Sequence, residues 1–384
     1  MSEAILTRRG GGGATITFDE YGIIELNKVD IGVSLSIARD NLAATNIGDY
    51  ALFGGGGGST GKTIDAYNSN LIYSSPTPLS VNRSNLAATS IGDYALFGGD
   101  SNTVDAYNSN LTITSPLNLS QSGRNLAATN IGDYALFGGG RVNVSSKIVD
   151  AYNSNLTHST PTPLSVSRGN LAATNIGDYA LFGGGYVNNT VDAYNSNLTH
   201  STPTPLSLAR GYLAATSIGD YALFGGGNRN IVSNAVDAYN SSLTHSTPTL
   251  LSLARDKLAA TSIGDYALFG GGGFYAIDDG SNIVDIYNRN LVHSVSSPLI
   301  EGRRNLAATS IGDYALFGGG SGFGNTFNTM DIYQYINSIT TSIYPGTKYK
   351  FQNMEEETTA DSFEEITIPG PVTGYIKYKN TTLS

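Results

Sequence analysis

The sequence predicts an all-β protein in which seven similar four-stranded sheets are arranged around a central axis. The first observation is a nine-residue motif, Ile-Gly-Asp-Tyr-Ala-Leu-Phe-Gly-Gly, whose seven copies begin at Ile47, Ile91, Ile131, Ile176, Ile218, Ile263 and Ile311. The second is the spacing of the copies, 40–48 residues, which is typical of repeat architectures. The third is that the segments between turn residues are too short for helices.

Each repeat contains four candidate strands, named A to D here and shown by the fourth repeat. Strand A is Leu171–Ile176, strand B is Tyr179–Phe182, strand C is Val191–Tyr194, and strand D begins at Leu198. The Gly-Asp pair between strands A and B predicts a tight hairpin turn, because Gly tolerates positive φ and Asp bonds its own backbone.

Strand B determines how these sheets must pack. Tyr179 and Leu181 lie on one face of the strand, and Ala180 and Phe182 lie on the other. A strand that is apolar on both faces must be covered on both faces. Four-stranded sheets that are covered on both sides and repeat around an axis form a β-propeller, and seven repeats predict seven blades.

The repeat resembles the kelch-repeat family from about residue 30 to about residue 336. The marks of that family are a Gly-Gly pair after an apolar strand, a Tyr in the next strand and an Arg that opens the next repeat. Here Gly183-Gly184, Tyr194 and Arg210 occupy those places. The usual Trp after the Tyr is missing, since the chain contains no Trp, and a Leu lies near that position. The resemblance implies that the B–C loops and the D–A connections share one face, which commonly binds a partner.

The ends of the chain predict how the ring closes and where the domains lie. Val33–Arg39 matches the end of a repeat, so we expect a strand near Asp30–Ile37 to supply strand D of the last blade and to protect the sheet edges. Residues 336–343 are the competing candidate for that strand. The resulting domains are an N-terminal segment, the propeller and a C-terminal module, at residues 1–28, 29–336 and 337–384.

The two terminal segments predict further β-structure. Ala14–Phe18 and Ile23–Leu26 predict a small β-hairpin after a flexible Gly run. Residues 348–351, 365–368 and 375–378 predict the short strands of a small β module, which the N-terminal hairpin could join. The opening residues 4–11 resemble the start of tail or tail-fibre proteins of phages that infect Gram-positive bacteria.

Composition excludes several classes of function. The net charge is −10 and much of the acidity is distributed over the repeats, so we expect no electrostatic binding of nucleic acid. There are no cysteines, and no apolar run has the length of a signal peptide or a membrane span. We therefore expect no membrane insertion, and a location in a virion tail if the protein derives from a phage or in the cytoplasm otherwise.

The residues that could carry out chemistry are dispersed by the repeat. All four histidines occupy the same place in strand D, the outer strand of a kelch-like blade, so they cannot converge on one metal or one active site. The strand C aspartates are also spread around the ring, whereas acid–base catalysis needs two nearby groups in different environments. We expect no cofactor, no metal and no catalytic residues.

A specific binding site should lie where the repeats differ, which is at the mouth of the ring beside blades five and six. The third repeat has Gly123 in place of the repeated Arg, with Arg124 one step on. Two residues after this position, five blades carry Asn, but Tyr212 and Lys257 replace it in two adjacent blades. The longest B–C loop follows directly. The candidate ligand-binding residues are Arg39, Arg83, Arg168, Arg210, Tyr212, Arg255, Lys257, Phe274, Tyr275, Asp278, Asp279 and Arg303. The alternative for the arginines is that they pair with the strand C aspartates and are structural.

A mouth with Arg, Asn and aromatic side chains suits a carbohydrate or an acidic peptide. The favoured hypothesis is a non-enzymatic receptor-binding protein on a phage tail or other particle. It would recognise a bacterial surface glycan, contact other particle proteins through its terminal modules and form a homo-oligomer. The alternatives are an intracellular kelch-type scaffold for a protein partner and a kelch-like sugar-processing enzyme.

Overall fold

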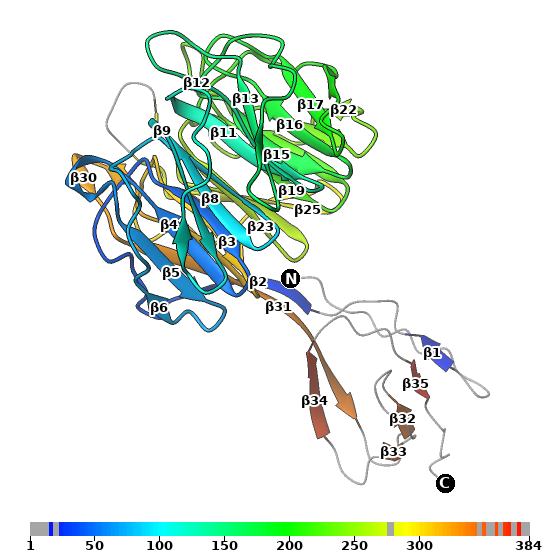
Figure 1. Cartoon of the computed structure of the whole chain (residues 1–384). Coiled ribbons are helices and arrows are strands. Elements are labelled where there is room, and N and C mark those ends of the chain that lie inside the picture. Colours follow the sequence, from blue (N-terminus) through cyan, green and yellow to red (C-terminus); the bar gives the residue numbers. More distant parts are fainter. Residues whose placement is uncertain are drawn as a thin grey trace, which may run out of the picture. The chain divides into compact units, whose positions relative to one another are not determined.

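Six copies of the repeat each form a four-stranded sheet in the computed structural model, and the seventh copy lies in a five-stranded sheet that also includes residues 364–369. The structure describes residues 15–17, 23–274, 280–343, 348–350, 358–359, 364–369 and 375–377. The chain divides into two units, Lys28–Tyr333 and a second unit of Met1–Asn27 with Gln334–Ser384. Within the described residues the first unit is a seven-bladed β-propeller, as the repeats predict. The colour of the chain passes from blue through green to orange around its blades (Figure 1).

The strands follow the four segments of the repeat. Strand A is β3 (Ala43–Ile47), β7 (Ala87–Ile91), β11 (Arg124–Ile131), β15 (Ala172–Ile176), β19 (Ala214–Ile218), β23 (Ala259–Ile263) and β27 (Ala307–Ile311). Strand B is β4 (Tyr50–Gly54), β8 (Tyr94–Gly99), β12 (Tyr134–Arg141), β16 (Tyr179–Gly183), β20 (Tyr221–Gly225), β24 (Tyr266–Gly270) and β28 (Tyr314–Gly318).

The outer strands are listed in the same blade order. Strand C is β5 (Ile64–Asn68), β9 (Ser101–Asn108), β13 (Val149–Asn153), β17 (Val191–Asn195), β21 (Val236–Asn240), β25 (Val284–Asn288) and β31 (Met330–Ile343). Strand D is β6 (Tyr73–Ser74), β10 (Ile113–Thr114), β14 (His158–Ser159), β18 (His200–Ser201), β22 (His245–Ser246), β26 (His293–Val295) and β2 (Ile23–Val29). The B–C loops add a 3-10 helix, Gly58–Thr60, and a hairpin of β29 (Ser321–Gly322) and β30 (Asn325–Thr326).

The predicted hairpin between strands A and B is present in the blades. In the fourth blade Ile176 pairs with Tyr179, so the turn contains only Gly177 and Asp178. Gly177 is the first of the two turn residues and has a left-handed φ of +50°, as in a type II′ turn. Strand D is shorter than predicted, because Leu198 lies in the turn before β18 with a φ of +58°.

Adjacent blades interlock through the Phe and the first Gly of strand B. A Cβ atom on Gly183 would lie 2.6 Å from Cε1 of Phe224 in the next blade, so only glycine fits there. The same contact closes the ring, since Gly318 of the seventh blade faces Phe53 of the first. Strand A of each blade also lies beside strand A of the next, including β27 beside β3, so the A strands surround the axis.

A buried tyrosine in strand C belongs to the layer of side chains that packs between each pair of neighbouring blades, called the inter-blade layer here. Tyr194 is fully buried, packs edge-on against Phe182 with ring centroids 6.0 Å apart, and donates its hydroxyl proton to the carbonyl of Thr162. Because the hydroxyl is paired, the ring can be buried without the cost of an unsatisfied polar group. Burial raises the pKa of Tyr194 above its ordinary value, so this donor stays protonated.

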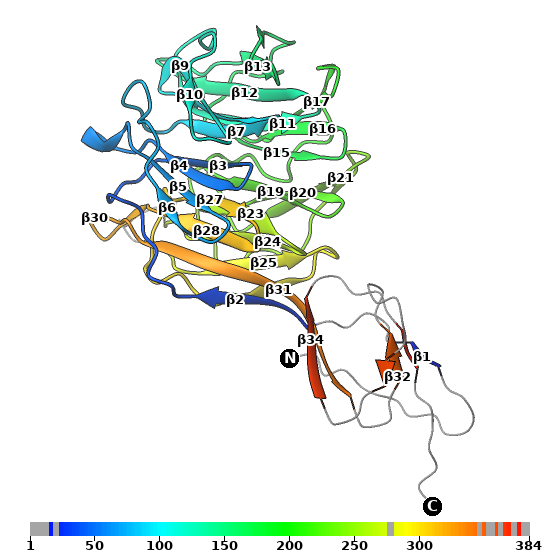
Figure 2. The same ribbon diagram turned by 60° about the horizontal axis from the view of Figure 1, so that its bottom comes forward.

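The N-terminal part of the chain closes the last blade, but through an earlier strand than predicted. In the sheet of the last blade the strands lie in the order β27-β28-β31-β2, as Figure 2 shows. Lys28 in β2 contacts Asp331 at 2.7 Å, where the histidine of strand D contacts the aspartate in four other blades. The prediction of a strand at Asp30–Ile37 was wrong in position, because Val33–Arg39 forms the connection from the seventh blade to the first. Residues 336–343 instead continue strand C as part of β31.

The second unit contains short strands at the three predicted C-terminal places. Its sheet has the order β1 (Thr15–Thr17), β35 (Tyr375–Lys377), β32 (Lys348–Lys350) and β33 (Thr358–Thr359), while β34 (Glu364–Pro369) pairs with residues 338–343 of β31. The predicted N-terminal hairpin is wrong, because β1 pairs with β35 and β2 pairs with β31. No helix in the described residues has the length and apolar character that crossing a bilayer requires.

The inter-blade layer yields a prediction for stability. Phe182→Ala and Tyr194→Ala should each reduce the free energy of unfolding by about 3–5 kcal/mol, because each substitution leaves a cavity between blades four and three. Urea denaturation followed by circular dichroism measures the change. Val166→Ala, at a partly exposed side chain in the connection before blade four, is the control. A loss below about 1 kcal/mol in both core variants would contradict this packing.

Candidate functional site

The mouth of the propeller is a cavity of about 460 Å³, to which each blade contributes two residues. The second residue of each pair is a leucine. The first is Asn41, Asn85, Asn125, Asn170, Tyr212, Lys257 or Asn305. The structure therefore brings Tyr212 and Lys257 into one central cavity.

A closed circle of backbone hydrogen bonds holds these seven residues. The amide of Asn85 donates to the carbonyl of Asn41 at 2.8 Å, and each following residue donates to its predecessor in the same way. The amide of Asn41 donates to the carbonyl of Asn305 at 2.9 Å and completes the circle. The position and direction of the mouth side chains are therefore fixed by the backbone of the whole ring.

This circle requires a left-handed backbone at every member. The seven residues have φ values between +52° and +59°. Asn adopts this conformation more readily than other residues with a side chain, which explains its presence in five blades. Tyr212 and Lys257 adopt it at a cost in conformational energy. Backbone strain of this kind is found at functional sites, so the two exceptions mark this part of the mouth as a candidate site.

Tyr212 and Lys257 interact with one another. The ammonium group of Lys257 lies 5.4 Å from the ring centroid of Tyr212, within the range of a cation–π contact. Burial raises the pKa of Tyr212; Asp256 and Tyr186 raise it further, and Arg141 opposes the shift. The hydroxyl of Tyr212 thus stays protonated and can donate a hydrogen bond to a ligand.

The connection that carries Lys257 is held by a polar pair that the sequence analysis missed. Asp256 is buried and accepts a hydrogen bond from the side-chain amide of Asn228. Burial raises the pKa of Asp256, and the neighbouring charge of Lys257 opposes this. Two features of the sequence could have indicated this pair. Asp256 directly follows the repeated arginine, and Asn228 is an unusual residue in the preceding B–C loop.

The long B–C loop of the sixth blade starts next to Lys257. The backbones of Asp256 and Gly273 exchange two hydrogen bonds, of 3.1 and 2.8 Å, which fix the beginning of the loop. Phe274 follows this bridge and is half-buried. The predicted site residues Tyr275, Asp278 and Asp279 lie outside the described residues.

The six arginines of the candidate set do not belong to the mouth surface. Each is at most 1% exposed and its guanidinium group forms an ion pair with the strand C aspartate of the same blade; the arginines are Arg39, Arg83, Arg168, Arg210, Arg255 and Arg303. This corrects the expectation that they contact a ligand and favours the structural alternative. Residue type and spacing do not distinguish a ligand-binding arginine from a structural one, because both kinds would lie in the D–A connection.

In six blades the arginine donates to the carbonyl of the strand B phenylalanine and pairs with the strand C aspartate. Arg168 of the fourth blade serves as the example. Arg168 contacts Oδ2 of Asp192 at 2.5 Å and also donates to the carbonyls of Phe182 and Thr190, at 3.0 and 3.1 Å. Burial lowers the pKa of Arg168, and Asp192 opposes this shift. The pair links the D–A connection to strands B and C. It therefore stabilises the connection that leads to the mouth without lining the mouth itself.

The histidines complete these networks at the outer edge. Nε2 of His200 lies 2.6 Å from Oδ1 of Asp192, and its ring packs on Tyr194 with centroids 5.1 Å apart. The same arrangement occurs in the third, fifth and sixth blades. Within the described residues, no three His, Asp or Glu side chains gather in a way that could hold a metal ion.

Comparisons with known proteins support the fold. No protein-family model and no curated protein matches the chain. The structure titled "Structure of YjhT", a propeller, is similar with a TM-score of 0.53 at 11% sequence identity, covering 79% of this chain and 99% of that chain. At this identity the likeness concerns the fold alone.

The strained backbone at the mouth yields a prediction. Lys257→Asn should raise the free energy of unfolding by about 0.5–1 kcal/mol, because Asn tolerates positive φ better than Lys. The reverse substitution in the first blade, Asn41→Lys, should lower it by a similar amount. Thermal and urea unfolding of both variants measure these changes. A destabilised Lys257→Asn variant would show that the lysine is retained for stability.

The buried ion pairs yield a prediction for pH dependence. Burial alone would raise the pKa of Asp237, but Arg210 and the hydrogen bonds from Ser207 and His245 lower it below the ordinary value of 3.8. A carboxyl group whose pKa is lower in the folded than in the unfolded protein stabilises the folded state. This contribution to the free energy of unfolding is fully present at pH values above the unfolded-state pKa, and it is lost as the pH falls through the folded-state pKa.

Asp237→Asn should therefore cost about 3–5 kcal/mol at pH 7, because it leaves Arg210 buried without its partner. The difference from the unmodified protein should narrow below about pH 4. Urea denaturation between pH 3 and pH 7 measures both effects. A difference that stays constant across this range would contradict the assignment of the ionised pair.

Proposed function

We propose that the protein is a non-enzymatic binding propeller whose mouth recognises a bacterial surface glycan, and that it serves as a receptor-binding component of a phage tail or similar particle. The observation that supports this most directly is the pairing of Tyr212 and Lys257 in the mouth, at two adjacent positions where the backbone favours Asn. The propeller fold itself is compatible with a binding or scaffold role.

The chemistry of the mouth suits a sugar. An aromatic ring can cover the apolar face of a pyranose, and amide side chains can bond its hydroxyl groups. Tyr212 supplies a ring and a protonated hydroxyl, Lys257 supplies a cation for an acidic sugar or phosphate, and five asparagines surround them. The seven leucines add apolar surface to the lining of the cavity.

A binding role is favoured over catalysis by the composition of the cavity. Glycoside hydrolysis uses two carboxyl groups that flank the scissile bond. The residues that line the mouth in the described part of the chain are Asn, Leu, Tyr and Lys, without a carboxylate among them. The buried carboxylates of strand C are paired with arginine in six blades.

The link to a phage particle rests on two features. The first is the resemblance of residues 4–11 to the start of phage tail proteins. The second is that the strands from both ends of the chain form one sheet, in which β1 pairs with β35. We propose that this second unit attaches the propeller to other particle proteins. The kelch-like motifs also suit an intracellular scaffold, for which an acidic peptide in the same mouth is the expected ligand.

The test is a binding screen of the full chain against bacterial surface polysaccharides and intact Gram-positive cells. The double variant Tyr212→Asn/Lys257→Asn should bind about 10- to 100-fold more weakly, because a hydrogen bond to a charged group contributes about 1.5–3 kcal/mol. This variant restores the residue found in the other blades, so the fold is preserved. Tyr73→Ala, at an exposed tyrosine of strand D, is the matched control and should bind normally.

Two results would contradict the proposal. Saturable glycan binding that is unchanged in the double variant would place the site away from the mouth. If the folded protein binds no glycan and no cell, the scaffold for a protein partner becomes the better explanation.

A further inference from the structure

The third blade differs from the others at the buried arginine. In the connection before the fifth blade, Leu206-Ser-Leu-Ala is followed by Arg210, whereas the connection before the third blade reads Leu119-Ser-Gln-Ser followed by Gly123. The strand C aspartate of this blade, Asp150, is nevertheless present. Six blades thus pair this aspartate with an arginine of the chain, and the third blade does not.

The neighbouring Arg124 does not replace the missing group. Its side chain is 59% exposed, and its Nε lies 4.0 Å from the carboxylate of Asp100 in the second blade. It also belongs to β11, where it pairs with Arg141 of β12. The side chain of Arg124 is therefore directed to the surface, away from Asp150.

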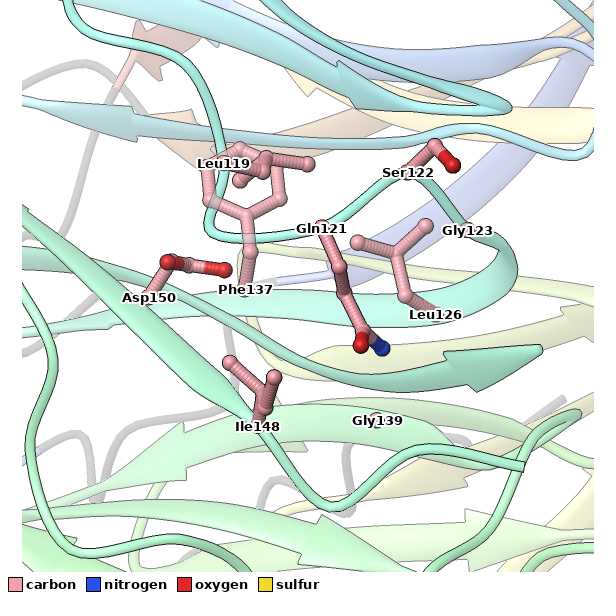
Figure 3. A pocket seen from close by; sticks show the side chains of 9 residues that line it. All are labelled: Leu119, Gln121, Ser122, Gly123, Leu126, Phe137, Gly139, Ile148 and Asp150. Atoms are coloured by element: carbon pink, nitrogen blue, oxygen red, sulfur yellow. The ribbon is translucent and has the colours of Figure 1, made fainter. Parts of the chain in front are cut away.

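A small pocket lies where the arginine would be. It is lined by Gly123 and Asp150 together with Leu119, Gln121, Ser122, Leu126, Phe137, Gly139 and Ile148 (Figure 3). In the fourth blade the guanidinium of Arg168 binds Asp192 and the carbonyls of Phe182 and Thr190. Asp150, Phe137 and Ile148 are the equivalent residues of the third blade, so the pocket retains all three acceptor positions.

Asp150 is only partly satisfied by the chain. Ser120 donates from its amide at 3.0 Å and from its hydroxyl at 2.5 Å, and His158 lies 2.8 Å away, all at Oδ1. In other blades Oδ2 is the atom that contacts the arginine. Asp150 is 5% exposed, whereas Asp192, Asp237 and Asp285 are fully buried. The carboxylate is thus nearly buried but reachable from the pocket.

The shape of the pocket favours a planar cation. The apolar side chains of Leu119, Leu126 and Ile148 can cover its faces, while the acceptors lie at its edge. The pocket has room for about one water molecule beyond its side chains. The amide of Gln121 extends into the space between Leu126 and Ile148 (Figure 3), so a ligand larger than water requires this half-buried side chain to turn outward.

We propose that the third blade binds a guanidinium group from outside the chain, at Asp150, in the place that arginine fills in six other blades. The group comes either from a small guanidino compound or from an arginine side chain of a protein partner. Ser122, which is exposed, and Gly123 lie at the entrance. This site is separate from the mouth, and its existence does not depend on the glycan proposal.

The experiment measures binding of methylguanidinium to the full chain by calorimetry and by saturation-transfer NMR, with methylammonium at equal ionic strength as the comparison. The unmodified protein should bind methylguanidinium at one site and prefer it at least 10-fold over methylammonium. Gly123→Arg should abolish binding and raise Tm. A Cβ on Gly123 would lie 3.7 Å from its nearest neighbour and needs no left-handed backbone, so this variant can fold. Asp150→Asn should also abolish binding.

Arg168→Gly is the matched variant, because it creates the same gap in the fourth blade. It should bind methylguanidinium at a second site and regain part of its lost Tm when the ligand is added. If Arg168→Gly gains such a site while the third blade shows none, the proposal is wrong for the natural pocket. Equal binding to the unmodified protein and to Gly123→Arg would also overturn it, since the ligand would then bind elsewhere.

Two further ligands distinguish the source of the group. Agmatine represents small guanidino compounds, and a pentapeptide with a central arginine represents a protein partner. Tighter binding of agmatine than of the peptide supports a small-molecule ligand, and the reverse order supports insertion of a partner's arginine. Equal affinity for methylammonium and methylguanidinium would overturn the assignment of a planar cation.

Discussion

The contact between the strand B phenylalanine of one blade and the strand B glycine of the blade before it is the constraint on which the rest of the structure depends. The distance between neighbouring sheets is set by a ring that touches backbone, as at Gly183 and Phe224. Any side chain on the glycine would separate the blades. Because seven equivalent contacts return to the starting blade through Gly318 and Phe53, the spacing also closes the ring. The circle of hydrogen bonds at the mouth can form only when this spacing holds.

Within the propeller, the buried Arg–Asp ion pairs hold the D–A connections in position. An ion pair such as Arg210–Asp237 gives up hydration on both partners, and an apolar replacement of similar volume can be equally stable. The pair binds three segments at once, however, since the arginine reaches strands B and C from the connection that leads to the mouth. The connection is thereby held in one conformation, and the residue two places later is placed in the circle. The third blade shows that the ring tolerates the loss of one such pair.

The sequence allowed the propeller and the number of blades to be predicted, because the motif fixes strands A, B and C by their side chains. Strand D was located less well, since β2 pairs through its backbone and has no resemblance to the repeat except for the cation Lys28. At the site, Tyr212 and Lys257 could be found because they break a pattern of Asn. The burial of the arginines could not be found in this way. A repeated Arg near a repeated Asp fits both an exposed ring and a buried pair, and only the packing around the side chain distinguishes them.

The hydrogen-bonded circle at the mouth has a consequence for the evolution of binding. A helix exposes unpaired donors at one end and unpaired acceptors at the other, and these ends attract ions. A circle has no ends, and the peptide groups between Asn41 and Asn305 follow one another head to tail until they meet. The scaffold therefore presents a neutral rim, on which the charge and shape offered to a ligand come from seven interchangeable side chains. A new ligand preference can then arise by exchanging one or two of them, while the backbone that carries them stays the same.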